Sequence, residues 1–305
     1  MRYAVTGAAG FIGSHLAEAL AAAGHEVVGL DCFTDYYDPA LKEENARGLD
    51  VRRVDLAEDE LDFAGLDGVF HLAGQPGVRS FGDVFPLYLR RNVLASQRVF
   101  EAAARDGARV VFSSSSSVYG AAERYPTPET TVPRPLSPYG ITKLASEHLA
   151  TAYEREFGLD CVTLRYLNAF GPRQRPDMAF TRIAFALAAG TRFVLYGDGE
   201  QSRGWTYVGD VVEATILAMA RGSGTYNVGG AIEASMNETI ALLEQISERT
   251  LDISREPAVP GDQRRTSADT SRIRAELGWE PRTSLEDGLR AQWEWASARM
   301  ADRSS

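Results

Sequence analysis

Short apolar runs alternate with longer amphipathic or alanine-rich segments over the first half of the chain. The runs predict strands at residues 2–6, 26–30, 51–54, 68–72, 109–113 and 161–166. The segments between them predict helices, the longest of which lie at residues 11–23, 85–106 and 138–157. Apolar strands that alternate with helices of this length indicate a parallel sheet covered on both faces. We therefore expect an α/β fold built on a doubly wound (Rossmann) parallel sheet.

The alternation becomes less regular after residue 170, in a loop rich in proline and arginine. The remaining pattern predicts a helix at 179–189, a strand at 192–196, a helix at 208–220 and, at 226–228, a strand that returns to the main sheet. The tail from residue 235 predicts a helix, an extended segment and two more helices, with three core tryptophans, Trp279, Trp293 and Trp295. We expect a Rossmann domain at residues 1–168 and 205–230, and a smaller, partly interleaved C-terminal α/β lobe at residues 169–204 and 231–305.

The composition excludes several classes of protein. The chain has 305 residues, is 44% hydrophobic and 24% charged, and carries a net charge of −10 without a basic block, which argues against a nucleic-acid partner. No apolar run approaches the roughly 20 residues that span a bilayer, and the N-terminal apolar segment lacks a signal-peptide pattern. Cys32 and Cys161 offer neither a disulfide framework nor metal-ligand spacing. We expect a cytoplasmic protein with no membrane partner and no metal.

Three glycines, Gly7, Gly10 and Gly13, separate the first strand from the first helix. The first permits a tight turn, the second lets the backbone approach a pyrophosphate, and the third lets the helix pack closely on the strand. A phosphate there meets the free N–H groups and the dipole of a helix N-terminus. The second strand ends in Asp31, whose carboxylate can bind an adenosine ribose and would repel a 2′-phosphate. The fingerprint predicts NAD as the cofactor, in preference to NADP.

Two further strand ends carry candidate residues. Asp55 follows the third strand, where it either contacts adenine or closes a turn. His71 ends the fourth strand and is expected to be a packed strand histidine rather than a catalytic base. The small residues Ala73 and Gly74 would let the cofactor lie against this strand end. Ligands of doubly wound sheets bind beyond the carboxyl ends of the strands, so these residues predict one common site.

A serine run at residues 113–117 follows the fifth strand, and Tyr139 and Lys143 lie one turn apart on the predicted helix 138–157. An ammonium near a phenol favours the phenolate and lowers its pKa, which is about 10 in water. A hydroxyl of the serine run could complete a relay to a substrate alcohol. A Tyr-x-x-x-Lys pair also occurs by chance on helix surfaces, and the NAD fingerprint is what favours a site here.

Taken together, these residues resemble the extended short-chain dehydrogenase/reductase superfamily, specifically its nucleotide-sugar epimerase branch. The resemblance covers nearly the whole chain and is carried by residues 6–13, 71–73, 113–120, 139–143, 164–172 and 203–210. It implies a catalytic triad of Ser115, Tyr139 and Lys143. It implies NAD contacts from Gly7, Gly10, Phe11, Ile12, Asp31, Asp55, Leu56, Leu72, Ala73, Tyr139, Lys143 and Tyr166.

The resemblance also implies a mechanism. In a 4-epimerase, Tyr139 takes the proton of the sugar 4-hydroxyl while C4 is oxidised, Lys143 holds the nicotinamide ribose, and Ser115 steadies the 4-keto intermediate. Relatives that dehydrate have an acid–base Asp-Glu pair after this serine, and relatives that decarboxylate usually have a glutamate. This chain has Ser116 and Ser117 there, and a serine hydroxyl is a poor acid or base at neutral pH. The pattern favours epimerisation without net redox change.

Three segments resemble UDP-glucuronate 4-epimerases, namely residues 31–39, 75–79 and 175–179. The guanidinium fork of an arginine suits carboxylate and phosphate groups, and serine hydroxyls can donate to a carboxylate. We expect substrate contacts from Arg79, Ser115, Ser116, Ser117, Tyr139, Asn168, Arg175, Arg203 and Asp262.

Four positions bear on the substrate. Asn168 stands where UDP-glucuronate 4-epimerases commonly have threonine, and asparagine is more usual there in UDP-galactose 4-epimerases and decarboxylases. Gly204 and Trp205 stand where an aspartate and an aromatic residue are usual. Asp262 resembles a position near the uridine ribose, although a turn aspartate is an equal interpretation.

The leading hypothesis is NAD-dependent 4-epimerisation of UDP-glucuronate to UDP-galacturonate. The alternatives are a UDP-glucose/UDP-galactose 4-epimerase, then a UDP-glucuronate decarboxylase or 4,6-dehydratase. A net oxidoreductase would instead turn over free NAD(H), and a dinucleotide sensor would bind NAD with a silent triad. In relatives, the helices that correspond to 85–106 and 138–157 pair across a two-fold axis, so we expect a homodimer with a four-helix interface. The apolar residues Leu89, Val93, Val99 and Phe100 either line that interface or pack within the chain.

Overall fold

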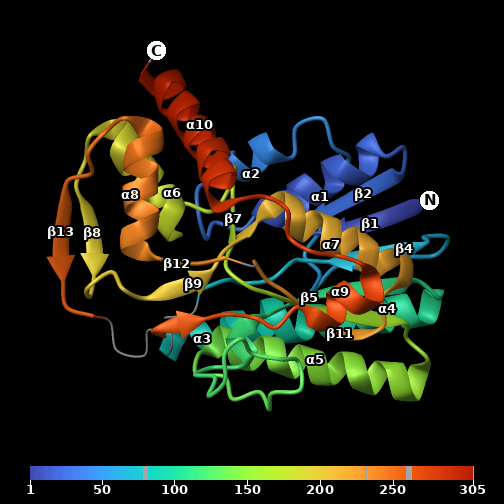
Figure 1. Cartoon of the computed structure of the whole chain (residues 1–305). Coiled ribbons are helices and arrows are strands. Elements are labelled where there is room, and N and C mark those ends of the chain that lie inside the picture. The colour runs from blue at the N-terminus through green and yellow to red at the C-terminus, as the bar shows by residue number, and fades with distance from the viewer. Residues whose placement is uncertain (78–81, 231, 259–262, 305) are drawn as a thin grey trace.

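The centre of the protein is a seven-stranded parallel sheet, seen in a computed structural model that describes residues 1–77, 82–230, 232–258 and 263–304 (Figure 1). The strand order is β11-β6-β5-β4-β1-β2-β3. The strands are β1 (Arg2–Thr6), β2 (Glu26–Asp31), β3 (Val51–Arg53), β4 (Gly68–His71), β5 (Arg109–Ser115), β6 (Cys161–Tyr166) and β11 (Gly224–Val228). The predicted doubly wound sheet is confirmed, and the strand predicted at 226–228 returns to it as β11 beside β6.

Helices cover both faces of the sheet, as the spacing of apolar residues predicts. Helices α1 (Phe11–Ala22) and α7 (Val208–Arg221) lie together on one face, and α4 (Ala95–Asp106) and α5 (Pro138–Phe157) lie together on the other (Figure 1). The helix predicted at 85–106 consists of α3 (Phe85–Tyr88), a π-helical segment (Leu89–Leu94) and α4.

The structure decides between the two interpretations for Val99 and Phe100, whereas for the exposed Leu89 and the half-buried Val93 the interface stays a prediction. Val99 and Phe100 are fully buried and pack within the chain against the sheet, so neither is available to a partner. Leu89 and Leu94 are each 44% exposed and remain on the surface. In the part of the chain that is described, no helix is long and apolar enough to cross a membrane.

Most of the remaining elements form a smaller lobe beyond the carboxyl ends of the main strands. Its helices are α6 (Ala179–Ala189), α8 (Met236–Ser247) and α10 (Leu285–Ser304), and they share a core with residues such as Phe170, Phe180 and Leu289. Its strands form small sheets: β7 (Ala169–Phe170) with β10 (Thr206–Tyr207), β8 (Phe193–Tyr196) with β13 (Ile253–Glu256), and β9 (Ser202–Gly204) with β12 (Glu233–Ser235) and β14 (Arg265–Thr266). The division of the chain into two domains stays a prediction.

The three predicted core tryptophans differ in burial. Trp279, which follows α9 (Ser271–Leu277), is 1% exposed, and its indole N–H donates to the Asp210 carbonyl at 3.0 Å. Trp293 and Trp295 on α10 are only half-buried. The prediction of a core anchor is therefore confirmed for Trp279, while Trp293 packs against the core of the lobe from its edge.

The turn from β1 to α1 depends on glycine. Gly7 has a φ of +70°, and a Cβ there would lie 2.9 Å from the backbone nitrogen of Ala73 after β4. A Cβ on Gly13 would lie 2.1 Å from the Gly7 carbonyl oxygen. Helix α1 starts after Gly10 with no side-chain cap, so its first N–H groups face outward from the turn.

We expect Gly13→Ala to destabilise the protein by about 1–3 kcal/mol, because the added methyl group overlaps a backbone oxygen that cannot move freely. Thermal unfolding followed by circular dichroism measures this loss. Ala21→Ser, at an exposed position of the same helix, is the control and should stay within about 0.5 kcal/mol of the wild type. Equal stability of Gly13→Ala and the control would contradict the close packing of this turn.

Candidate active site

A cavity of about 740 Å³ opens where the strands of the main sheet end. Its walls come from the turn after β1, the carboxyl ends of β2, β4, β5 and β6, the first turn of α5, and the lobe at β8 and β9. Parallel strands present these ends on one edge, which is where ligands of such sheets bind.

The structure brings together every predicted site residue that it describes. The following residues all line this cavity: Gly7, Gly10, Phe11, Ile12, Asp31, Asp55, Leu56, Leu72, Ala73, Ser115, Ser116, Ser117, Tyr139, Lys143, Tyr166, Asn168, Arg175 and Arg203. Arg79 and Asp262 lie outside the described residues.

One end of the cavity fits a dinucleotide. Gly7 and Gly10 line this end in a tight turn, where a Cβ would lie 2.9 Å from Ala73 N and 3.0 Å from the Gly7 carbonyl oxygen, respectively. The uncapped start of α1 offers N–H groups to an anion. Asp31 is only 8% exposed and is held by two backbone amides, Ala9 N at 3.1 Å and Phe33 N at 2.8 Å. A carboxylate fixed in this way at the end of β2 suits a ribose diol.

Sequence reasoning missed a buried cation beside Asp31. Lys42, on the short helix α2 (Pro39–Asn45), is 6% exposed, and its ammonium donates to Thr34 Oγ1 at 2.7 Å. Burial lowers the pKa of Lys42, although the charge of Asp31 raises it. Local sequence around Lys42 resembles that of an exposed helix, so only its tertiary position reveals it.

The serine run forms a tight turn at the end of β5. Ser115 Oγ accepts a hydrogen bond from Ser117 N at 3.1 Å and so caps the turn Ser116–Val118. Helix α5 packs its first turn directly onto these residues, because a Cβ on Gly140 would lie 2.4 Å from the Ser117 carbonyl oxygen. The close approach brings Tyr139 within hydrogen-bond reach of Ser115.

Lys143 lies one turn further along α5 and is 3% exposed. Its ammonium donates to the Ser113 carbonyl at 2.7 Å and lies 5.9 Å from the centre of the Tyr139 ring. Burial lowers the pKa of Lys143 to about 8, although the charge of Glu147 raises it.

The protein alone does not lower the pKa of Tyr139 in the way that the Tyr-x-x-x-Lys spacing predicts. Burial raises the pKa of this phenol, while the charge of Arg175 and the hydrogen bond with Ser115 lower it. The physical reason is that the cost of desolvating a phenolate outweighs the stabilisation from the Arg175 charge and the Ser115 hydrogen bond. The ammonium of Lys143 is turned toward the end of β5 and bonds there.

His71 is a packed strand histidine, as expected. It is fully buried, with Nδ1 at 2.8 Å from Thr6 Oγ1 and Nε2 at 2.9 Å from Ser96 Oγ. Burial and the charge of Lys143 lower its pKa to about 3, so the ring is neutral at pH 7.

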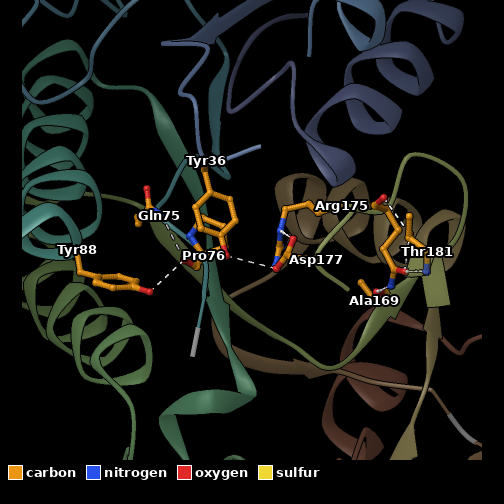
Figure 2. A network of polar contacts seen from close by, with 9 residues as sticks. Tyr36, Gln75, Pro76, Tyr88, Ala169, Arg175, Asp177 and Thr181 are labelled. Atoms are coloured by element: carbon orange, nitrogen blue, oxygen red, sulfur yellow. Dashed lines mark hydrogen bonds and ion pairs between the residues drawn. The ribbon is translucent and has the colours of Figure 1, made fainter. Parts of the chain in front are cut away.

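A polar network crosses the other end of the cavity (Figure 2). Arg175 donates from Nε and Nη2 to the two carboxylate oxygens of Asp177, each at 3.0 Å. Tyr36 points toward the same carboxylate and donates to it at 3.4 Å (Figure 2). The loop after β2 thus meets the proline- and arginine-rich loop of the lobe. Asp177 and Tyr36 were not predicted as site residues, although both lie in segments that carry the resemblance.

Asn168 links the end of the main sheet to the lobe. Its backbone has a φ of +41°, and its amide donates to the Gly204 carbonyl at 3.2 Å and to Thr266 Oγ1 at 2.9 Å. Trp205 packs on Phe180 with ring centres 4.1 Å apart. The unusual Gly204-Trp205 pair therefore contributes to the small lobe sheets and their core.

Residues 3–229 match the model of the NAD dependent epimerase/dehydratase family. The chain belongs to this family. Its membership confirms the resemblance drawn from the sequence and NAD as the cofactor, for which the cavity offers the glycine turn and Asp31.

Similar members of the NAD dependent epimerase/dehydratase family differ in the sugar for which they are named. A UDP-glucuronic acid 4-epimerase from Bacillus cereus, solved with UDP-glucuronic acid and NAD, is 37% identical, with a TM-score of 0.94 and coverage of 98% of this chain and 100% of its own. A UDP-glucose 4-epimerase from Mycolicibacterium smegmatis is 36% identical over 303 residues, 95% of this chain and 96% of its own. A Bacillus subtilis protein named as an uncharacterized UDP-glucose epimerase is 40% identical, with the same coverage.

Proposed function

We propose that the protein is a UDP-glucuronate 4-epimerase, which interconverts UDP-glucuronate and UDP-galacturonate through a 4-keto intermediate. The observation that carries this proposal is the wall of the cavity around Ser115 and Tyr139. Ser116, Ser117 and Arg175 line it. Arg175 gives Nε and Nη2 to Asp177, so the group it offers to a sugar carboxylate is Nη1, together with the serine hydroxyls.

The acids of the cavity wall support epimerisation over elimination. Among the described lining residues these acids are Asp31, Asp55 and Asp177. Asp31 is held by backbone amides, Asp55 pairs with Arg90 at 2.8 Å, and Asp177 pairs with Arg175. A dehydratase needs a carboxylate poised to move a proton at the sugar, and each of these three is engaged elsewhere.

The proposed reaction assigns one task to each member of the triad. Bound NAD supplies the oxidation and the later reduction at C4 of the sugar. Tyr139 accepts the proton of the 4-hydroxyl and returns it after the ketone has turned over. Ser115 donates a hydrogen bond to the same oxygen, and the positive charge of Lys143 favours the phenolate during the cycle.

A UDP-glucose/UDP-galactose 4-epimerase is the second candidate. It is supported by the similarity to the Mycolicibacterium smegmatis enzyme and by the asparagine at position 168. The positive φ of Asn168 gives an independent reason for this residue, because asparagine adopts the left-handed region more readily than β-branched threonine. Asn168 therefore does not argue against a uronate here.

We extend the proposal to the surroundings of the site. The sugar nucleotide would lie between the Rossmann domain (1–168 and 205–230) and the lobe (169–204 and 231–305), near Arg203. The proposed location is the cytoplasm, in keeping with the two unpaired thiols of Cys32 and Cys161. The proposed homodimer would use α5 and the helical segment before α4, where Leu89, Leu94 and Ile141 are more than 40% exposed.

Incubation with UDP-glucuronate should produce UDP-galacturonate, which ¹H NMR detects as a second anomeric signal. Tyr139→Phe should lower the rate roughly 100-fold or more, because it removes the proton acceptor while the ring still packs. Formation of a UDP-pentose with release of carbon dioxide would identify a decarboxylase. Turnover of UDP-glucose with none of UDP-glucuronate would move the assignment to the neutral sugar.

Replacement of Arg175 by methionine should change the choice of sugar. We expect the ratio of kcat/KM for UDP-glucuronate over UDP-glucose to fall roughly tenfold or more, since a hydrogen bond to a charged group is lost. Loss of the Arg175 charge also affects the pKa of Tyr139, but this affects the turnover of both sugars and cancels in the ratio. Arg173→Met is the matched control, because Arg173 pairs with Glu18 at 2.8 Å and is not among the lining residues. An unchanged ratio in Arg175→Met would exclude its role in uronate binding.

Light scattering at micromolar concentration should give twice the chain mass of 33.3 kDa. Leu89→Glu with Leu94→Glu should shift this mass to the monomer, because charges would be buried in the proposed interface. Ile232→Glu, 55% exposed on the lobe, is the control and should leave the dimer intact. A monomeric wild type at that concentration rules the dimer out.

A further inference from the structure

A second layer of polar side chains lies directly beneath the triad, and none of them lines the cavity. It consists of Tyr119, Glu147, Arg165 and Asn227, with Ser114 between this layer and the cavity wall. Ser114 precedes Ser115, Arg165 precedes Tyr166, and Glu147 lies one helical turn beyond Lys143. The layer is therefore tied through the backbone to residues of the site on β5, β6 and α5.

The contacts in this layer are short and mutually supporting. Arg165 donates from Nε and Nη2 to the two carboxylate oxygens of Glu147, at 2.9 and 2.6 Å. Ser114 Oγ donates to Glu147 at 2.5 Å, and Arg165 Nη1 donates to the Tyr119 hydroxyl at 2.9 Å. The side chains of Arg165 and Glu147 are only 8% and 10% exposed. Both oxygens of this buried carboxylate are therefore satisfied by hydrogen bonds from Arg165 and Ser114.

The same carboxylate acts on the ammonium of Lys143. From its own helix, Lys143 faces Glu147 and the phenol of Tyr139. From β5 it faces the ring of Phe112 and the Ser113 carbonyl, and from β4 it faces His71, which is neutral. Glu147 is thus the negative charge that opposes the cost of burying this ammonium.

We propose that Glu147 is a positioning residue of the epimerase, which holds α5 against the end of β5 and keeps Lys143 protonated at working pH. Lys143 can favour the phenolate of Tyr139 only while it carries its charge. Arg165 pairs with the buried Glu147 through two hydrogen bonds, and Ser114 adds one more. This inference rests on the proposed function only in the choice of the sugar nucleotide that is used to measure activity.

The test is the pH dependence of kcat/KM in a set of variants at one position. In the wild type we expect activity to fall as pH rises through the pKa of Lys143, about 8 in the protein alone. Glu147→Gln keeps the shape and removes the charge, so this fall should move to lower pH by roughly one unit. Glu147→Asp keeps the charge and should lower kcat without moving the fall. Ser114→Ala removes one hydrogen bond and no charge, and it is the matched control. It should leave the pH at which kcat/KM falls unchanged.

A purely structural role would give a different result. It predicts that Glu147→Gln and Glu147→Asp both lower kcat at every pH, with the alkaline fall unchanged, and this outcome would overturn the proposal. Because Glu147→Gln leaves the buried charge of Arg165 without its carboxylate partner, the double variant Glu147→Gln/Arg165→Gln is measured beside it. It removes both buried charges and should show the same displaced fall. A wild-type profile in the double variant would also overturn the proposal.

Failure of the proposed function is distinguishable from failure of this inference. If UDP-glucuronate is not turned over, the same profiles are measured with UDP-glucose, since Lys143 would serve either sugar. NAD affinity, measured by calorimetry as a function of pH, provides a readout without any sugar. We expect NAD affinity to change near the pKa of Lys143. The pH of this change should be lower in Glu147→Gln and the same as in the wild type in Ser114→Ala. A change at the same pH in all variants would count against the role of Glu147, whatever the substrate.

Discussion

Every strand of the main sheet runs in the same direction, and this constraint brings the parts of the site together. The turn after β1, Asp31 at the end of β2, Ala73 after β4 and Ser115 at the end of β5 all meet at one edge because their strands share a direction. Close packing then sets the distances. Helix α5 can approach the serine turn only because Gly140 lacks a side chain.

The site works with charges that burial disfavours. Lys42 and Lys143 are almost completely buried, and burial lowers the pKa of both ammonium groups. Each has a carboxylate nearby that acts in the opposite direction, Asp31 for Lys42 and Glu147 for Lys143. In a medium of low dielectric constant such a partner has a large effect.

The small lobe completes the cavity through polar contacts with distant parts of the chain. Tyr36 meets Asp177 across the cavity (Figure 2). Arg173 pairs with Glu18 on α1, and Arg299 on α10 pairs with Glu44 on α2 at 2.5 Å. These contacts join the lobe to the loop after β2 and to two helices of the Rossmann part. This end of the cavity is therefore built from segments more than 100 residues apart in sequence.

Local pattern determined much of this protein. Apolar runs and helical spacing predicted the strands of the parallel sheet, and the glycines with Asp31 predicted a site for NAD, because period and turn chemistry act over a few residues. Tertiary structure alone decided that Lys42 and Asp177 line the cavity, that Val99 and Phe100 are buried while Leu89 is not, and that burial raises the pKa of Tyr139. Burial and ion pairing depend on contacts between segments that lie far apart in the sequence. A local sequence pattern carries no information about those contacts.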